Sequence, residues 1–210
     1  MQTPVTTIFL AGGEGARMRS NTPKPLHTLC GLPMLDWVMR AARFPGAGET
    51  VPPIAIVSAG EEQIRAHYGD RLCYVQEPRR RGTGAALIAA LPLLQSQAGR
   101  ALVLAADIPL IQPATLAAFA RLDCAAAVLT STLPDPSGYG RVLRTPDGAF
   151  AGIVEEEDQA LKQTIKEVCV SAYCFDMQVL ANLLADLEGT IGQGELRMGC
   201  LLYTSPSPRD

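Results

Sequence analysis

The sequence predicts an α/β fold in three layers, with a mostly parallel sheet covered by helices on both faces. Up to residue 122, short runs rich in β-branched residues alternate with segments of helical period. Such alternation indicates crossover units, whose strands run parallel in one sheet. One of the runs, at residues 101–105, is apolar throughout. A strand of that kind is typical of the middle of a sheet, where both faces are buried.

The elements of this first part follow from local patterns. In the first expected helix, Leu35, Val38 and Met39 recur at helical spacing, and Pro33 suits the first turn. The strands are expected at residues 6–10, 54–58, 72–75 and 101–105. The helices are expected at residues 33–43, 61–68, 84–94 and 113–122.

Beyond residue 125 the alternation stops, and short strands are separated by turn residues instead. Two of these strands are joined by Asp147-Gly148, a pair typical of a tight hairpin. The chain has no internal repeat and no linker, so a single domain is expected. The remaining strands are expected at residues 128–133, 141–144, 150–155 and 168–175, followed by a helix at 177–187.

Composition excludes several classes of protein. The net charge of −3 argues against a chain-wide nucleic-acid surface. No run of 18 apolar residues is present, and the first residues lack the pattern of a signal peptide. The six cysteines form no CxxC pair, which favours reduced thiols. We therefore expect a cytoplasmic protein with neither a nucleic-acid partner nor a membrane partner.

The last eleven residues, 200–210, have no periodicity and differ in character from the chain before them. They resemble the translation of a sequencing-library adapter, so we expect them not to be native; a natural tail rich in serine and proline is the alternative. We expect the native domain to occupy residues 1–199 and to continue beyond them in the natural protein.

A glycine-rich loop follows the first strand, in the segment Leu10-Ala-Gly-Gly-Glu-Gly-Ala-Arg-Met18. It lacks the third glycine of a dinucleotide fingerprint and the Gly-Lys-Ser/Thr ending of a P-loop. Arg17, Arg19 and Lys24 face only Glu14 in residues 11–25, which gives this segment a local charge of +2. Loop amides and fixed cations suit a triphosphate. The alternative is an ordinary turn with solvated charges.

Asp107 follows the most apolar strand of the chain. Ligands bind at the carboxyl ends of the strands in open α/β sheets, and a carboxylate there needs a cation or hydrogen-bond donors. Mg²⁺ is the expected partner. The alternative, a cap on the helix that begins near Pro113, requires a residue closer to that helix.

Six ordered motifs are similar to those of the sugar-1-phosphate nucleotidyltransferases, in particular their N-acetylglucosamine-1-phosphate uridylyltransferase domains. The similarity covers residues 5–195. The motifs are the loop with Pro23-Lys24-Pro25-Leu26-His27, Gln76-x5-Gly82-Thr83-Gly84, Asp107-Ile-Pro-Leu110, Asp135-Pro-Ser-Gly-Tyr-Gly-Arg141, Ile153-Val-Glu155 and Gln193-Gly-Glu195.

This resemblance implies a Rossmann-like, three-layer nucleotidyltransferase fold with a mixed, mostly parallel sheet and a small β-hairpin insertion that binds sugar. It implies Mg²⁺-dependent attack of a sugar 1-phosphate on the α-phosphorus of UTP, with catalytic roles for Arg17 and Lys24 and with Asp107 as metal ligand. The implied sugar contacts are Gly140, Glu155 and Cys169. The implied nucleotide contacts are Leu10, Ala11, Gly12, Gly13, Gln76, Gly82 and Thr83.

Four departures from the family pattern leave the substrates open. Gly12 and Ala16 alter the loop, Ala105 replaces a tyrosine, and Cys169 replaces an asparagine that can offer amide hydrogen bonds. Another sugar phosphate such as glucose 1-phosphate, or dTTP or GTP as nucleotide, is the alternative within the class. A non-catalytic sugar-nucleotide binding protein is the alternative outside it.

The family's second magnesium ligand and its acetyltransferase domain both fall beyond residue 210. We therefore expect weak nucleotide binding and slow turnover from these 210 residues alone. The resemblance also leaves open a homo-oligomer formed through that further domain.

Overall fold

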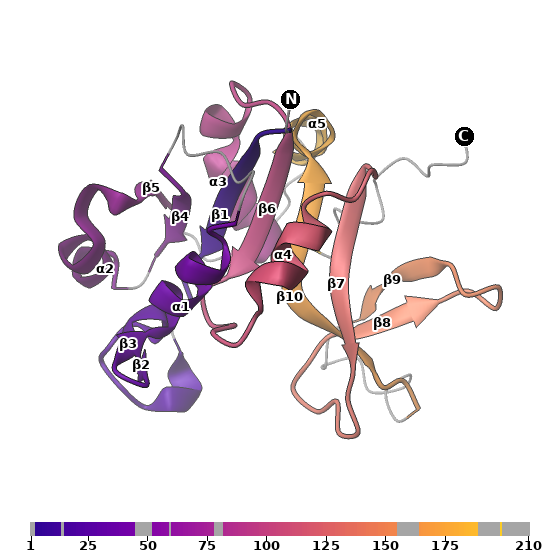
Figure 1. Ribbon diagram of the computed structural model, residues 1–210, viewed down its shortest axis with the longest axis horizontal. Coiled ribbons are helices and arrows are strands. Elements are labelled where there is room, and N and C mark those ends of the chain that lie inside the picture. The colour runs from indigo at the N-terminus through magenta and orange to yellow at the C-terminus, as the bar shows by residue number, and fades with distance from the viewer. Residues whose placement is uncertain are drawn as a thin grey trace.

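A central sheet organises the molecule. The computed structural model describes residues 3–13, 15–44, 52–58, 60–77, 82–154, 164–188 and 198. Within these ranges the sheet has eight strands in the order β5-β4-β1-β6-β10-β8-β9, with β7 paired to β10 (Figure 1).

One half of the sheet is parallel. It consists of β1 (Val5–Leu10), β4 (Ile54–Val57), β5 (Cys73–Gln76) and β6 (Arg100–Ala105). The chain places β4 on one side of β1 and β6 on the other, so that Leu10 lies beside both Ile56 and Ala105. Helical connections that leave a sheet in opposite directions open a crevice at the carboxyl ends of the strands, where ligands bind.

The other half is antiparallel. It consists of β7 (Ala126–Thr132), β8 (Arg141–Arg144), β9 (Phe150–Val154) and β10 (Glu167–Asp176). The hairpin predicted across Asp147-Gly148 is present, and β8 and β9 project from the body of the sheet (Figure 1). The register of β10 on β7 shifts between Cys169 and Tyr173. This irregularity lies near the end of the parallel strand β6.

Helices cover both faces of the sheet. On one face α1 (Met34–Ala41), α2 (Glu61–Tyr68) and α4 (Pro113–Phe119) share a buried cluster with Phe9, Leu102 and Leu104. On the other, α3 (Thr83–Leu94) and α5 (Met177–Glu188) pack with Ile8 and Val103. Since successive residues of β1 and β6 point to opposite faces, each strand supplies both cores. The predicted three-layer α/β fold is confirmed.

One detail of the prediction is wrong. Pro33 does not form the first turn of α1, because it belongs to β3 (Leu32–Pro33), which pairs with β2 (Thr28–Leu29). The turn between these strands holds Cys30 and Gly31 at positive φ. Pro33 therefore keeps an extended ψ of 145°, and the helix begins one residue later, at Met34.

The helices are short relative to a membrane span. In the part of the chain that the structure describes, none is both long enough and apolar enough to cross a bilayer.

Candidate active site

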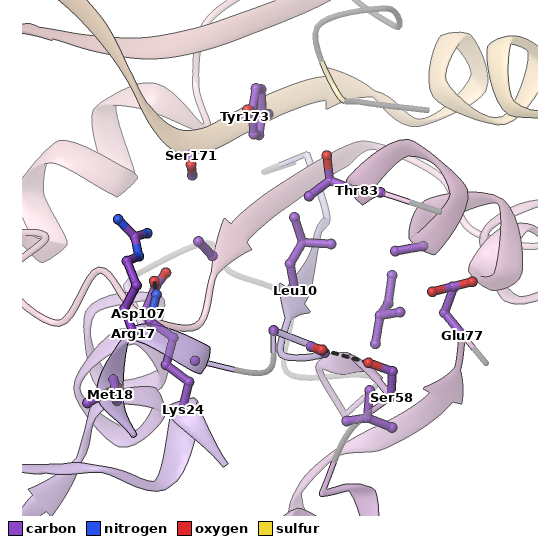
Figure 2. Close-up of a pocket in the computed structure, with 18 residues that line it drawn as sticks. Leu10, Arg17, Met18, Lys24, Ser58, Glu77, Thr83, Asp107, Ser171 and Tyr173 are labelled. Carbon is purple, nitrogen blue, oxygen red and sulfur yellow. Dashed lines mark hydrogen bonds and ion pairs between the residues drawn. The ribbon is translucent and has the colours of Figure 1, made fainter. Parts of the chain in front are cut away.

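A cavity of about 720 Å³ opens at the carboxyl ends of the parallel strands (Figure 2). It is lined by the glycine-rich loop after β1, by the ends of β4 and β6, by the start of α3 and by β10. These segments are far apart in sequence, and the crossover topology brings them together. The volume suits a small organic ligand.

The glycine-rich loop forms one wall. Leu10, Gly12, Gly13 and Gly15 line the cavity, whereas Ala11 is 1% exposed and its N–H donates to the Ile56 carbonyl at 2.8 Å. Of the four loop residues with a predicted nucleotide contact, three therefore line the cavity. Ala11 is instead buried and anchors the loop to β4.

Ser58, at the end of β4, fixes the path of this loop. Its hydroxyl donates to the Gly12 carbonyl at 2.6 Å (Figure 2). A Cβ atom at Gly12 would lie only 2.8 Å from the Ser58 Oγ, so this close approach favours glycine. A Cβ atom at Gly13 would meet no other atom within 4 Å, and the backbone there is open to the cavity.

Two cationic side chains enter the cavity from short 3₁₀ helices. Arg17 lies in η1 (Ala16–Met18), and Lys24 begins η2 (Lys24–Leu26). A Cβ atom at Gly15, which has a φ of 62°, would lie 3.0 Å from the Lys24 Cβ, so the two segments are closely packed. Lys24 forms an ion pair with Asp107, and Arg17 lies on the same side of the cavity (Figure 2). The three residues with predicted catalytic or metal roles are thus brought together.

Asp107 has the chemistry of a magnesium ligand. Its side chain is 32% exposed, and Asp107 lines the cavity two residues after β6 ends. Within the described ranges, no group of three or more histidine, cysteine, aspartate or glutamate side chains could hold a metal ion. A single carboxylate fits Mg²⁺, which commonly takes one or two protein carboxylates and fills its other positions with phosphate oxygens and water.

Another part of the cavity wall is formed by the residue that follows β5 and by the start of α3. Gly82 and Thr83 line it, with Gly82 at a φ of 95° just before the helix. Gln76 is exposed and is not among the lining residues, whereas the next residue, Glu77, lines the cavity and is 8% exposed. The structure therefore places the predicted base-contacting amide outside the cavity wall, and that role stays a prediction.

Two of the three predicted sugar contacts, Gly140 and Cys169, lie at the register shift in β10. Cys169 is buried, its N–H donates to the Gly140 carbonyl at 2.9 Å, and its thiol contacts the Tyr173 hydroxyl at 3.2 Å. Neither Cys169 nor Gly140 lines the cavity; Ser171 and Tyr173 do. Glu155 lies outside the described residues.

An ion pair fixes the hairpin to β10. Two guanidinium nitrogens of Arg144, at the end of β8, donate to the Glu167 carboxylate at 2.6 and 2.7 Å. These hydrogen bonds hold the pKa of Glu167 below its ordinary value and raise the pKa of Arg144. The pair connects β8, which follows Gly140, with β10, which contains Cys169.

Sequence reasoning missed Ser58, Glu77, Ser171 and Tyr173 as lining residues. Ser58 and Glu77 carried a usable signal, because each stands at the carboxyl end of a predicted parallel strand. Ser171 and Tyr173 carried none, since their access to the cavity depends on the register shift in β10.

Comparison with known proteins agrees with this geometry. The family described as "MobA-like NTP transferase domain" matches residues 7–176, which includes the glycine-rich loop, both cations and Asp107. The chain belongs to this family. It therefore carries a nucleotidyltransferase domain. The expected nucleotidyltransferase fold is confirmed.

Two relatives of this NTP transferase domain are bifunctional GlmU proteins. That of Heliobacterium modesticaldum is 38% identical over 195 residues, which are 90% of this chain and 42% of the relative. That of Sorangium cellulosum is 37% identical over 207 residues, 92% of this chain and 43% of the relative. The chain thus spans less than half the length of these curated relatives.

A solved structure shares the fold of the NTP transferase domain. The inositol-1-phosphate CTP transferase from T. maritima superposes with a TM-score of 0.72 at 17% identity, covering 97% of this chain and 81% of that one. At this identity the match concerns the fold alone.

Proposed function

We propose that this domain transfers a nucleotidyl group from a nucleoside triphosphate to a sugar 1-phosphate, with release of pyrophosphate. The observation that carries the proposal is the convergence of Arg17, Lys24 and Asp107 with the glycine-rich loop in one cavity. Fixed cations and loop amides in such a cavity neutralise the charge that develops on a transferring phosphoryl group.

In the proposed reaction, a phosphate oxygen of the sugar 1-phosphate forms a bond to the α-phosphorus. The bond from that phosphorus to the oxygen bridging the α- and β-phosphates breaks, and its electron pair leaves with pyrophosphate. Arg17 and Lys24 hold phosphate oxygens, while the glycine-rich loop orients the nucleotide. No side chain serves as nucleophile. When bound at Asp107, Mg²⁺ would supply further positive charge to the phosphates.

As specific substrates we propose UTP and N-acetylglucosamine 1-phosphate. The relatives that support this are named bifunctional GlmU proteins, and the motifs resemble uridylyltransferase domains. The resemblance also points to UDP-N-acetylglucosamine as a cell-envelope precursor made in the cytoplasm.

Another nucleotide or sugar phosphate is the second candidate. It is favoured by the position of Gln76 outside the cavity wall and by the burial of Cys169, whose thiol replaces an amide. The structural neighbour from T. maritima is named as a CTP transferase acting on inositol 1-phosphate.

A substrate panel tests the proposal. The purified chain would be incubated with Mg²⁺ and each of UTP, CTP, GTP and dTTP, against N-acetylglucosamine 1-phosphate and glucose 1-phosphate. We expect pyrophosphate release to be fastest with UTP and N-acetylglucosamine 1-phosphate. Faster release with another pair would replace the specific substrates, and nucleotide binding without release in any combination would favour a binding protein instead.

A further inference from the structure

The register shift of β10 places one non-glycine residue in an unusual conformation at the cavity wall. Ser171 has a φ of 56°, a left-handed value that serine rarely adopts. Among the described residues, Arg19 and Cys30 are the other non-glycine residues at positive φ, and neither lines the cavity. Strained backbone that persists at a cavity wall points to a function for the residue that carries it.

Neighbouring groups hold this conformation. The N–H of Ser171 donates to the Cys169 sulfur at 3.4 Å, and that thiol in turn contacts the Tyr173 hydroxyl. Cys169 is 6% exposed, so it supports the irregular segment from beneath. The Cys169 thiol therefore stabilises the irregular segment of β10 through these two contacts.

The Ser171 hydroxyl remains available. In the part of the chain that the structure describes, this oxygen has no hydrogen-bond partner, although Ser171 lines the cavity. Figure 2 shows Ser171 and Tyr173 on β10, across the cavity from Lys24 and Asp107. The next residue, Ala172, pairs with Leu104, which puts Ser171 beside the end of β6.

We propose that Ser171 contacts the sugar 1-phosphate and contributes to its selection, a role that rests on the proposed nucleotidyl transfer. The Ser171 hydroxyl both donates and accepts hydrogen bonds, so it matches a hydroxyl of the sugar ring. The glycine-rich loop and Thr83 border other parts of the cavity, which leaves the β10 side to the acceptor. Tyr173, two residues further along β10, lines the same side of the cavity.

Two substitutions at Ser171 separate the effect of its hydroxyl from the effect of its backbone strain. Ser171→Ala removes the hydroxyl and keeps a side chain at positive φ, whereas Ser171→Gly removes both. We expect both variants to raise the KM for N-acetylglucosamine 1-phosphate about tenfold, as loss of one substrate hydrogen bond commonly does, with the KM for UTP unchanged. Ser171→Gly should also raise the melting temperature by about 2–4 °C.

Ser131→Ala is the matched control, because it removes an exposed hydroxyl from the neighbouring strand β7. It should leave both KM values unchanged. An unchanged KM for the sugar phosphate in both Ser171 variants would overturn the proposal, and so would an equal rise in the KM for UTP.

Calorimetric titration separates failure of this proposal from failure of the proposed function. N-acetylglucosamine 1-phosphate would be titrated into each protein with Mg²⁺ and a non-hydrolysable UTP analogue, so that no turnover is required. Weaker binding to both Ser171 variants supports the contact even if wild-type protein releases no pyrophosphate. Equal binding to all proteins, or no binding to wild type, overturns it.

Discussion

The ammonium group of Lys24 and the carboxylate of Asp107 form an ion pair inside the cavity, although they are 83 positions apart in sequence. The side chains are 30% and 32% exposed. Water screens charges at this exposure, so the pair stabilises the fold by about 1 kcal/mol at most. Because it lies among the elements that we propose to bind phosphate, we assign the pair a role in the proposed chemistry rather than in stability.

Lys24→Met tests whether the ion pair contributes to the reaction rather than to stability. We expect kcat/KM for nucleotidyl transfer to fall by about 100-fold or more, since one positioned charge or donor commonly contributes that much. The free energy of unfolding should change by less than about 1 kcal/mol in urea denaturation. Arg121→Met, which removes an exposed cation beyond α4, is the control and should retain full activity. Near-normal turnover by Lys24→Met would contradict the catalytic role.

Asp107→Asn tests the proposed metal site. The amide keeps the shape of the side chain but is a poorer ligand for Mg²⁺, so the Mg²⁺ concentration for half-maximal activity should rise by about tenfold or more. The measurement is a Mg²⁺ titration of pyrophosphate release. Asp186→Asn, on the exposed side of α5, should leave the titration unchanged. Identical curves for the wild type and Asp107→Asn would rule Asp107 out as the ligand.

Gly12→Ala tests how tightly Ser58 fixes the glycine-rich loop. The added Cβ would lie 2.8 Å from the Ser58 Oγ and 3.3 Å from its backbone nitrogen, so either the loop or the Ser58 side chain must shift, and the hydrogen bond to Gly12 is lost or distorted. We expect a loss of about 1–3 kcal/mol, as for other overpacked sites, seen as a lower melting temperature. Gly13→Ala is the matched control, because its Cβ meets no protein atom within 4 Å. Equal melting temperatures for the two variants would show that the close approach is unimportant.

Arg144→Gln tests the ion pair that fixes the hairpin. Because the pKa of Glu167 is lowered in the folded protein, the pair stabilises the fold above the ordinary glutamate pKa, and this contribution is lost as the pH falls through the lowered value. Arg144 is 45% exposed, so the wild-type advantage at neutral pH should be about 1 kcal/mol or less. Urea denaturation at about pH 7 and about pH 3 measures it. An advantage that persists undiminished at the lower pH would contradict the ionic origin.

Tyr68→Phe should affect stability alone. The Tyr68 hydroxyl donates to the Asp36 carboxylate at 3.0 Å, and burial raises the pKa of Tyr68 well above its ordinary value, so the hydroxyl keeps its proton. Loss of this hydrogen bond to a charged group should cost about 1.5–3 kcal/mol in urea denaturation. Tyr68 lies outside the cavity lining, so KM values should not change. A shift in either KM would indicate coupling between α2 and the site.

Much of the fold could be predicted from the sequence because its patterns are local. The apolar runs at β1, β4 and β6 indicate buried strands, and Asp147-Gly148 indicates the hairpin. Both the glycine-rich loop and Asp107 follow the carboxyl ends of parallel strands. Because these ends meet at one edge of the sheet, the two could be expected to lie close together. The role of Pro33 was misjudged because the pairing of β2 with β3 overrides the preference of proline for a first helical turn.

The wall formed by β10 could not be predicted. Access of Ser171 to the cavity depends on a register shift, which arises from pairing with β6 and β7 rather than from the local sequence. Motif matching instead pointed to Cys169, which is buried at one end of this irregularity. Likewise, the motif at Gln76 does not reveal that Glu77, one residue further, lines the cavity.

Transfer of the α-phosphate is the central claim, and an isotope experiment tests it most directly. The chain would be incubated with Mg²⁺, N-acetylglucosamine 1-phosphate and UTP labelled with ³²P at the α-position, and the products separated by chromatography. We predict that the label moves into a nucleotide sugar in wild-type protein and that this product falls sharply with Lys24→Met. Label that stays in UTP, or that appears in UMP or UDP without a nucleotide sugar, would contradict the account.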